Sequence, residues 1–462
     1  MENIINKLPE LEVPLENPFK NDKLGRQFTA TTLTNIVSSY ANTGCVIALN
    51  GEWGTGKTTF LRMWKAHLLQ HKYRVIYLNA WEIDYIEDPI VALVSEIEEI
   101  GCDNDKFKRI TCFASNLVIT GLGGILKNFA KSYGVDIENM VNAATTEFSN
   151  SITEYKKTKK SLEDFKQSLS EYVVGEKEDK LPVVFIIDEL DRCNPSFAVK
   201  LLERVKHLFD VPNIAFVLSM CKSQFECSIK GFYGSENIDA SNYLRRFIDL
   251  EFELPMPTGE QFFDYLYDAY NFNQYFITAN AHGYTHNYVE IFKGAVKRLF
   301  TRTRLDLRTM DKIFAHCRLV AISMGNKPGL MDVILLLCFL RVVHHDKYKK
   351  IQTHSYSLQE LLEMLEDVFP KALMNEDVCD NQDYHGFIYS CADLLYVYNQ
   401  NTPQVYEKDI LPQDDKEMRL KCTIFTEYKL KEALQYCQGN IDVRLYKFSF
   451  LVEKMDILQN GL

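Results

Sequence analysis

The chain has 462 residues, of which 46% are hydrophobic and 25% are charged, a balance typical of a folded globular protein. Lysine and arginine number 52 against 63 aspartate and glutamate, so the formal net charge is -11. This composition excludes a fibrous or largely disordered protein, and the acidic balance disfavours nucleic acid as a general partner. The length predicts about three domains.

The cysteines and the N-terminus indicate a reducing compartment. The 12 cysteines include no C-x-x-C pair, and residues 1–19 lack the apolar segment of a secretory signal, so we expect a cytoplasmic protein. Residues 110–126 form an uncharged run near the lower length limit of a bilayer span, but serine, asparagine and glycine dilute it. We expect a buried or interfacial hairpin there, and no membrane span.

The first motif along the chain is a phosphate-binding loop. Residues 45–50 (CVIALN) predict a buried strand, a helical pattern begins near Lys57, and the sequence between them fits G-x-x-x-x-G-K-[ST]. Glycines let backbone N–H groups point at phosphate oxygens, Lys57 is expected to reach the β- and γ-phosphates, and Thr58 is expected to ligate Mg²⁺. The strand–loop–helix context argues against the alternative, a chance match. The residues expected to hold the nucleotide are Gly51, Trp53, Gly54, Thr55, Gly56, Lys57, Thr58 and Thr59.

A second buried strand, LPVVFIID, ends in acidic residues. We expect Asp188 to bind Mg²⁺ through water and Glu189 to polarise the attacking water. The alternative is that these acids cap a helix that starts near Asn194. For Asp191 and Arg192, a direct role and a salt bridge that orders the loop both stay open.

A third predicted strand, NIAFVLSM, ends near Ser219, which is expected to sense the nucleotide; a serine bonded to the backbone is the alternative. Arg245 and Arg246 precede a strand-like segment, and one of them is expected to be a finger that offsets charge on the γ-phosphate. The structural alternative for these arginines is pairing with Asp249 or Glu251.

Taken in order, these blocks resemble the KAP family of P-loop NTPases, a branch of the additional-strand group related to the STAND and AAA+ ATPases. The resemblance covers about residues 22–255 and rests on D-K-L-G-R, ALNGEWGTGKTTFL, N-A-W-E, FIIDELDRC and NYLRRFIDLEFELP. It implies ATP and Mg²⁺ as ligands, ATP hydrolysis, a finger arginine in the Y-L-R-R-F segment, and a setting in prokaryotic mobile elements or antiphage defence. Cys221 departs from the family, where an aspartate usually follows the third strand.

The fold class expected is α/β, a P-loop NTPase with a parallel sheet flanked by helices, followed by helices alone. We divide the chain into an NTPase core at 1–255 with a helical insertion at about 101–180, a helical lid at 256–348, and a C-terminal helical region at 349–462 for partner contacts. Many family members carry transmembrane helices in this insertion. Here we expect a soluble-type member, or one with a degenerate hairpin.

A second nucleotide sensor is expected at the start of a lid helix. The segment T-R-L-D-L-R-T-M resembles the helix that presents a sensor arginine in related ATPases. Arg308 is the first candidate for this role and Arg304 the second. The alternative is an exposed arginine that pairs with Asp306 or Asp311.

The sequence therefore predicts an ATPase whose hydrolysis drives a conformational change in an assembly. The partners expected are further copies of the chain, with a finger supplied by a neighbouring subunit, or a separate effector protein. The alternative is a nucleotide-gated switch or scaffold with slow turnover that recruits an effector. A nucleic-acid motor has no support from charge or motif.

Overall fold

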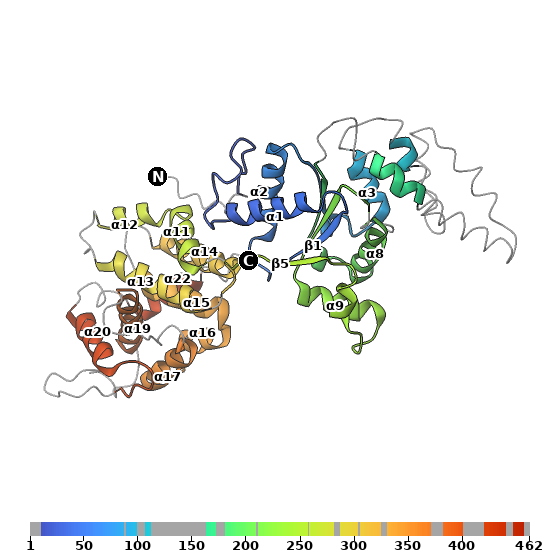
Figure 1. The fold of residues 1–462 in the computed structure, drawn as a ribbon. Coiled ribbons are helices and arrows are strands. Elements are labelled where there is room, and N and C mark those ends of the chain that lie inside the picture. The colour runs from blue at the N-terminus through green and yellow to red at the C-terminus, as the bar shows by residue number, and fades with distance from the viewer. Residues whose placement is uncertain are drawn as a thin grey trace. The chain divides into compact units, whose positions relative to one another are not determined.

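The computed structural model describes residues 11–86, 89–98, 107–111, 163–171, 181–208, 211–256, 258–280, 287–303, 305–324, 330–370, 382–400, 420–439 and 447–456 (Figure 1). These residues fall into two compact units. One comprises Leu11–Met256 and is called the sheet unit below. The other comprises the described residues after Pro257 and is called the helical unit.

The sheet unit is built on a five-stranded parallel sheet in the order β2-β3-β4-β1-β5. Its strands are β1 (Cys45–Asn50), β2 (Arg74–Asn79), β3 (Val183–Asp188), β4 (Ile214–Met220) and β5 (Leu250–Glu253). The three central strands, β3, β4 and β1, read as nearly continuous apolar runs because both of their faces are buried. β4 separates β1 from β3, and the carboxyl ends of all five strands lie at one edge of the sheet.

Helices cover both faces of the sheet. One face packs on α1 (Gln27–Ser39) and α2 (Lys57–Gln70), and the other on α3 (Pro89–Glu98), α8 (Pro195–Val205), α9 (Lys222–Tyr233) and α10 (Ala240–Leu244) (Figure 1). Alternate residues of β1 divide between these layers, with Ile47 facing the first and Ala48 the second. Short 3₁₀ turns follow three elements: η1 (Trp81–Ile83), η2 (Leu190–Arg192) and η3 (Lys206–Leu208).

This architecture confirms the predicted α/β class. Within the predicted insertion at 101–180, the structure describes only two helical segments, 107–111 and 163–171. Most of the apolar run at 110–126 lies outside the described residues. Across the described part of the chain, no helix is long and apolar enough to cross a membrane.

The described part of the helical unit contains helices and no strand. The helices are α11 (Gly259–Ala269), α12 (Phe272–Asn280), α13 (Asn287–Arg302), α14 (Leu307–Ser323), α15 (Met331–Val343), α16 (His345–Gln352), α17 (Leu358–Val368), α19 (Gln382–Gln400), α20 (Glu427–Gly439) and α22 (Phe448–Asp456). Residues 331–340 of α15 are all buried, which places this helix inside the unit.

A close helix contact joins the predicted lid to the predicted C-terminal region. A Cβ on Gly386 of α19 would lie 2.7 Å from the carbonyl oxygen of Ile291 and 2.9 Å from the Cα of Gly294, both on α13. Only glycine permits that approach. The described helices on either side of residue 348 thus pack as one unit, and separate roles for them stay a prediction.

Two buried acids lie inside the helical unit. Asp332 on α15 and Asp393 on α19 are each 1% exposed, and Asp393 accepts the S–H of Cys437 at 2.8 Å. Burial raises the pKa of both carboxyls, and each lies within reach of the other. Two ionised carboxylates have no donor to share, so we infer that one retains a proton and donates to the other.

We predict that this pair makes stability fall as the pH rises. The pKa of aspartate in an unfolded chain is about 4, so above this pH the unfolded chain releases a proton that the folded chain keeps. Stability therefore falls with rising pH until the pH passes the raised pKa of the folded pair. Asp393→Asn removes that requirement, because an uncharged amide can donate to Asp332. The stability of the variant relative to the wild type should therefore increase from about pH 5 to about pH 8.

The measurement is thermal unfolding followed by far-ultraviolet circular dichroism across that pH range. Asp367→Asn is the control, because Asp367 is 74% exposed in its side chain and pairs with Lys347. A stability difference between the wild type and Asp393→Asn that stays constant with pH would contradict the shared proton.

Candidate functional site

Two glycines with left-handed backbone shape the loop after β1. Gly54 has φ 79° and Gly56 has φ 84°, a region that favours glycine. Gly56 directly precedes α2, so the loop ends at a helix N-terminus, which attracts anions. A Cβ on Gly51 would lie 3.1 Å from the Oγ1 of Thr55, a tight contact from which the threonine side chain would have to shift.

Lys57 is bound by the loop itself. Its Nζ donates to the carbonyl oxygens of Gly51 (2.5 Å) and Glu52 (3.1 Å). Burial lowers the pKa of Lys57, and the charges of Asp191 and Asp188 oppose that shift. Backbone carbonyls are weaker partners for an ammonium than a phosphate, so a nucleotide can displace them. Thr58 and Thr59 follow in the first turn of α2.

Arg26, directly before α1, forms hydrogen bonds to the loop. It is 5% exposed, and it donates to the carbonyl oxygens of Thr55 (3.2 Å) and Pro255 (2.5 Å). Burial lowers the pKa of Arg26, while the charge of Asp22 opposes the shift. Asp22 in turn accepts the backbone N–H groups of Arg26 (2.5 Å) and Gln27 (3.1 Å) at the start of α1. The D-K-L-G-R block carried the family resemblance, but nothing in it indicated this contact.

Asp188 lies fully buried at the end of β3, with a donor on each oxygen. The hydroxyl of Tyr77 donates to Oδ2 at 2.8 Å, and the backbone N–H of Glu189 donates to Oδ1 at 2.8 Å. Tyr77 is on β2, where Asn79 pairs in register with Asp188. Burial, reinforced by the charge and hydrogen bond of Asp188, raises the pKa of Tyr77. The two donors fix the orientation of the carboxylate, and no motif in the sequence indicated this role for Tyr77.

Glu189 directly precedes η2 and has a left-handed backbone at φ 59°. Its Oε1 lies 2.6 Å from Nη1 of Arg192. A salt bridge was one of the two interpretations of Arg192, and it is present. The acids do not cap α8, because Asn194 is the cap and its side chain accepts the N–H of Ser196.

A tryptophan of the loop reaches the acidic turn. The Nε1 of Trp53 donates to Oδ2 of Asp191 at 2.5 Å, and Asp191 is 7% exposed. This hydrogen bond connects the loop after β1 with η2 after β3, although β4 lies between the two strands. It also explains why a bulky residue occupies this position of a glycine-rich loop.

Ser219 lies at the carboxyl end of β4, paired in register with Leu49 of β1. Its side chain is fully buried, and its Oγ finds no hydrogen-bond partner among the described residues. The backbone-bonded alternative therefore does not apply, and the sensor role stays a prediction. Nearby, the Sγ of Cys221 lies 3.6 Å from a carboxylate oxygen of Glu52.

Arg245 and Arg246 follow α10, and both are exposed. Neither of their expected carboxylate partners is bound to them. Asp249 accepts a backbone N–H of β1 at 2.8 Å, and Glu251 pairs with a lysine of α9 at 2.7 Å. A finger role for one of these arginines stays a prediction.

Arg308 belongs to the helical unit, in the first turn of α14, and is exposed. Asp306 caps that helix, and Asp311 accepts the hydroxyl of Tyr270 at 2.8 Å. The sensor role of Arg308 stays a prediction, and Arg304 lies outside the described residues.

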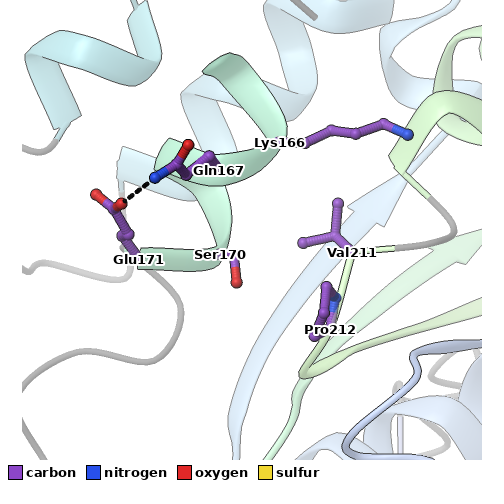
Figure 2. A pocket seen from close by; sticks show the side chains of 6 residues that line it. All are labelled: Lys166, Gln167, Ser170, Glu171, Val211 and Pro212. Carbon is purple, nitrogen blue, oxygen red and sulfur yellow. Dashed lines mark hydrogen bonds between the residues drawn. The ribbon is translucent and has the colours of Figure 1, made fainter. Parts of the chain in front are cut away.

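A pocket of about 260 Å³ lies at the opposite edge of the sheet, near the start of β4 (Figure 2). It is lined by Lys166, Gln167, Ser170, Glu171, Val211 and Pro212. None of the residues predicted to bind the nucleotide lines this pocket, so the two sites are distinct.

A parallel sheet with this loop after one strand and paired acids after another defines a P-loop NTPase. Residues 26–323 match the family described as the KAP family P-loop domain. The match spans more than half of the chain, which therefore belongs to the KAP family, and the resemblance predicted from the sequence is confirmed. That the loop after β1 binds the nucleotide stays a prediction.

Three solved structures are among those to which the chain is similar. Cdc6p from Pyrobaculum aerophilum is 13% identical with a TM-score of 0.39, covering 98% of this chain and 97% of that chain. The ORC1 protein of Aeropyrum pernix in complex with DNA is 12% identical (TM-score 0.35), and the ORC2 protein of the same organism is 14% identical (TM-score 0.32). For each of these two proteins, the match covers 100% of this chain and 97% of that chain. No curated protein matches the sequence.

We predict that Tyr77→Phe lowers the free energy of unfolding of the sheet unit by about 1.5–3 kcal/mol, because it removes a donor from a buried carboxylate. Tyr73→Phe is the matched control, since its hydroxyl contacts the neutral Ser38 hydroxyl at 2.5 Å, and it should cost about 1 kcal/mol. Urea unfolding followed by tryptophan fluorescence measures both, because all 3 tryptophans lie in the sheet unit. Equal losses in the two variants would contradict a special role for Tyr77.

Proposed function

We propose that this chain binds ATP with Mg²⁺ and hydrolyses it. The observation that carries the proposal is the pair Asp188 and Glu189 at the end of β3, with the first oriented by two donors and the second next to it in the chain. Trp53 connects this acidic turn to the phosphate loop by a hydrogen bond, which supports a single site for the residues proposed to bind phosphate and those proposed to activate water.

The residues present fit a magnesium-bound nucleotide. Hydroxyl and carboxylate oxygens are the ligands that Mg²⁺ prefers, and Thr58 and Asp188 would supply them. When bound, the ion offsets the negative charge that builds on the γ-phosphate. The Ser219 hydroxyl is buried without a partner among the described residues, and we propose that it contacts the nucleotide when the site is occupied.

The remaining roles follow from charge and position. Lys57 would exchange the carbonyls of its own loop for the β- and γ-phosphates. Glu189 would orient the attacking water and accept its proton. Arg245 or Arg246 would add a positive charge at the γ-phosphate, which its exposure permits across a subunit boundary.

We further propose that hydrolysis drives a conformational change in a cytoplasmic assembly, formed by copies of this chain, by a separate effector protein, or by both. Residues 349–462 are the proposed partner-binding region. An antiphage role follows from the family, whose members occur in mobile elements and antiphage defence. The acidic net charge of -11 gives no support to nucleic acid as a partner.

One observation favours a second candidate, a nucleotide-gated switch with slow turnover. The proposed catalytic carboxylate of Glu189 is engaged by Arg192 at 2.6 Å. A base held in an ion pair is a poor acceptor for a water proton. In that case ATP would select a conformation, and the output would be recruitment of an effector.

The proposal predicts that binding and turnover separate in two variants. Lys57→Ala should weaken ATP binding, because it removes the cation that contacts the phosphates. Glu189→Gln should bind ATP as the wild type does but lower kcat by about 100-fold or more, because the amide cannot accept a proton. Binding is followed by tryptophan fluorescence in a Trp81→Phe background, in which Trp53 of the loop remains together with the fully buried Trp64. Turnover is followed by phosphate release. Tight binding with negligible turnover in the wild type would favour the switch.

A trans-acting finger predicts complementation between two inactive variants. Glu189→Gln keeps its arginines, and the double variant Arg245→Ala/Arg246→Ala keeps its glutamate, so a mixed assembly contains some complete sites. Mixing the two should restore part of the activity, whereas each alone stays inactive. Lys200→Ala, at an exposed lysine of α8, controls for the loss of surface charge. If the mixture stays inactive, then either the finger acts within its own subunit or neither arginine is a finger.

A further inference from the structure

Local contacts fix the backbone at Glu189. Its carbonyl oxygen accepts the N–H of Arg192 at 3.1 Å and the S–H of Cys193 at 3.5 Å, and its own N–H donates to Asp188 at 2.8 Å. These bonds hold a left-handed conformation at φ 59°, which a residue with a side chain adopts only where its surroundings impose it. Such imposed conformations cluster at functional sites.

Arg192 determines where the Glu189 carboxylate lies. The pair is 2.6 Å long and joins residues of one turn, and the glutamate side chain is only 11% exposed. A guanidinium bound to a carboxylate oxygen occupies a position from which that oxygen would otherwise accept a hydrogen bond from water. The partner of the proposed base is thus supplied by the same short segment of chain as the base.

Trp81 gives Arg192 a second contact. The guanidinium lies over the indole ring at 5.9 Å from its centroid, and Trp81 is 53% exposed. The turn that carries Trp81 is fastened to the segment after η2, because the N–H of Asn194 donates to Asp84 at 3.0 Å. The arginine therefore lies between a solvent-exposed ring and the carboxylate.

We propose that Arg192 is a positioning residue that restrains Glu189, and that its departure from the ion pair sets the basal rate of turnover. The inference rests on the proposed hydrolysis, which makes Glu189 the base. The Arg192 side chain is 29% exposed, so water screens its attraction to the carboxylate and weakens the pair. The restraint therefore modulates the rate and does not block the reaction.

The test compares turnover in four variants with that of the wild-type chain. Arg192→Gln should raise kcat about two- to fivefold, the factor that a weak ion pair can supply, with no change in the KM for ATP. Arg192→Lys keeps the charge and should stay near the wild type. Trp81→Leu should give a smaller rise, because it removes only the support of the arginine. Lys200→Gln removes an exposed charge from α8 and should change nothing.

The outcomes separate this inference from the proposed function. An active wild type with kcat unchanged or lowered in Arg192→Gln would overturn the restraint and leave the hydrolysis standing. A raised KM would also overturn it, because the arginine would then contact the nucleotide. An equal rise in Lys200→Gln would show a general charge effect, with the same consequence. No turnover in the wild type or in Arg192→Gln, with ATP bound, would overturn both proposals. Unfolding followed by tryptophan fluorescence confirms that the variants fold.

Discussion

The parallel pairing of β1, β4 and β3 is the constraint on which the site depends. Because the three strands run in one direction, the phosphate loop after β1 and the acids after β3 emerge at the same edge of the sheet. One strand separates them, so the loop and the acidic turn are near each other but share no backbone hydrogen bonds. Side chains must join them, and the bond from Trp53 to Asp191 does so.

The three charged groups that we propose to act on the nucleotide are each engaged by the protein itself. Lys57 binds carbonyl oxygens, Asp188 binds a phenol and an amide, and Glu189 binds Arg192. Buried or half-buried charges need such partners, since an unpaired charge costs far more than a paired one. A nucleotide therefore enters by exchanging partners, and the free energy of binding is the difference between two sets of contacts. Both candidate functions, the ATPase and the switch, therefore begin from the same nucleotide-free state, in which the protein's own groups occupy these charges.

The motifs were predictable because their chemistry is local. A glycine loop between a strand and a helix, and acids that end an apolar run, are patterns of adjacent residues. Tyr77, Arg26 and Trp53 act across separations of 111, 229 and 138 residues, which only the sheet register and the packing of α1 determine. The packing of α13 on α19 was missed for a related reason: Gly386 permits it, and a single glycine does not alter helical periodicity.

Two kinds of arginine then divide control of the proposed reaction. Arg192 is three residues from Glu189, so its effect is intrinsic to each subunit and independent of protein concentration. Arg245 and Arg246 are exposed after α10, so any contribution they make to a neighbour depends on assembly. A site built in this way would be slow as a monomer, because the base is restrained and the finger is absent. Assembly would add the finger, and release of Arg192 would add the base, so the two effects on the rate would multiply.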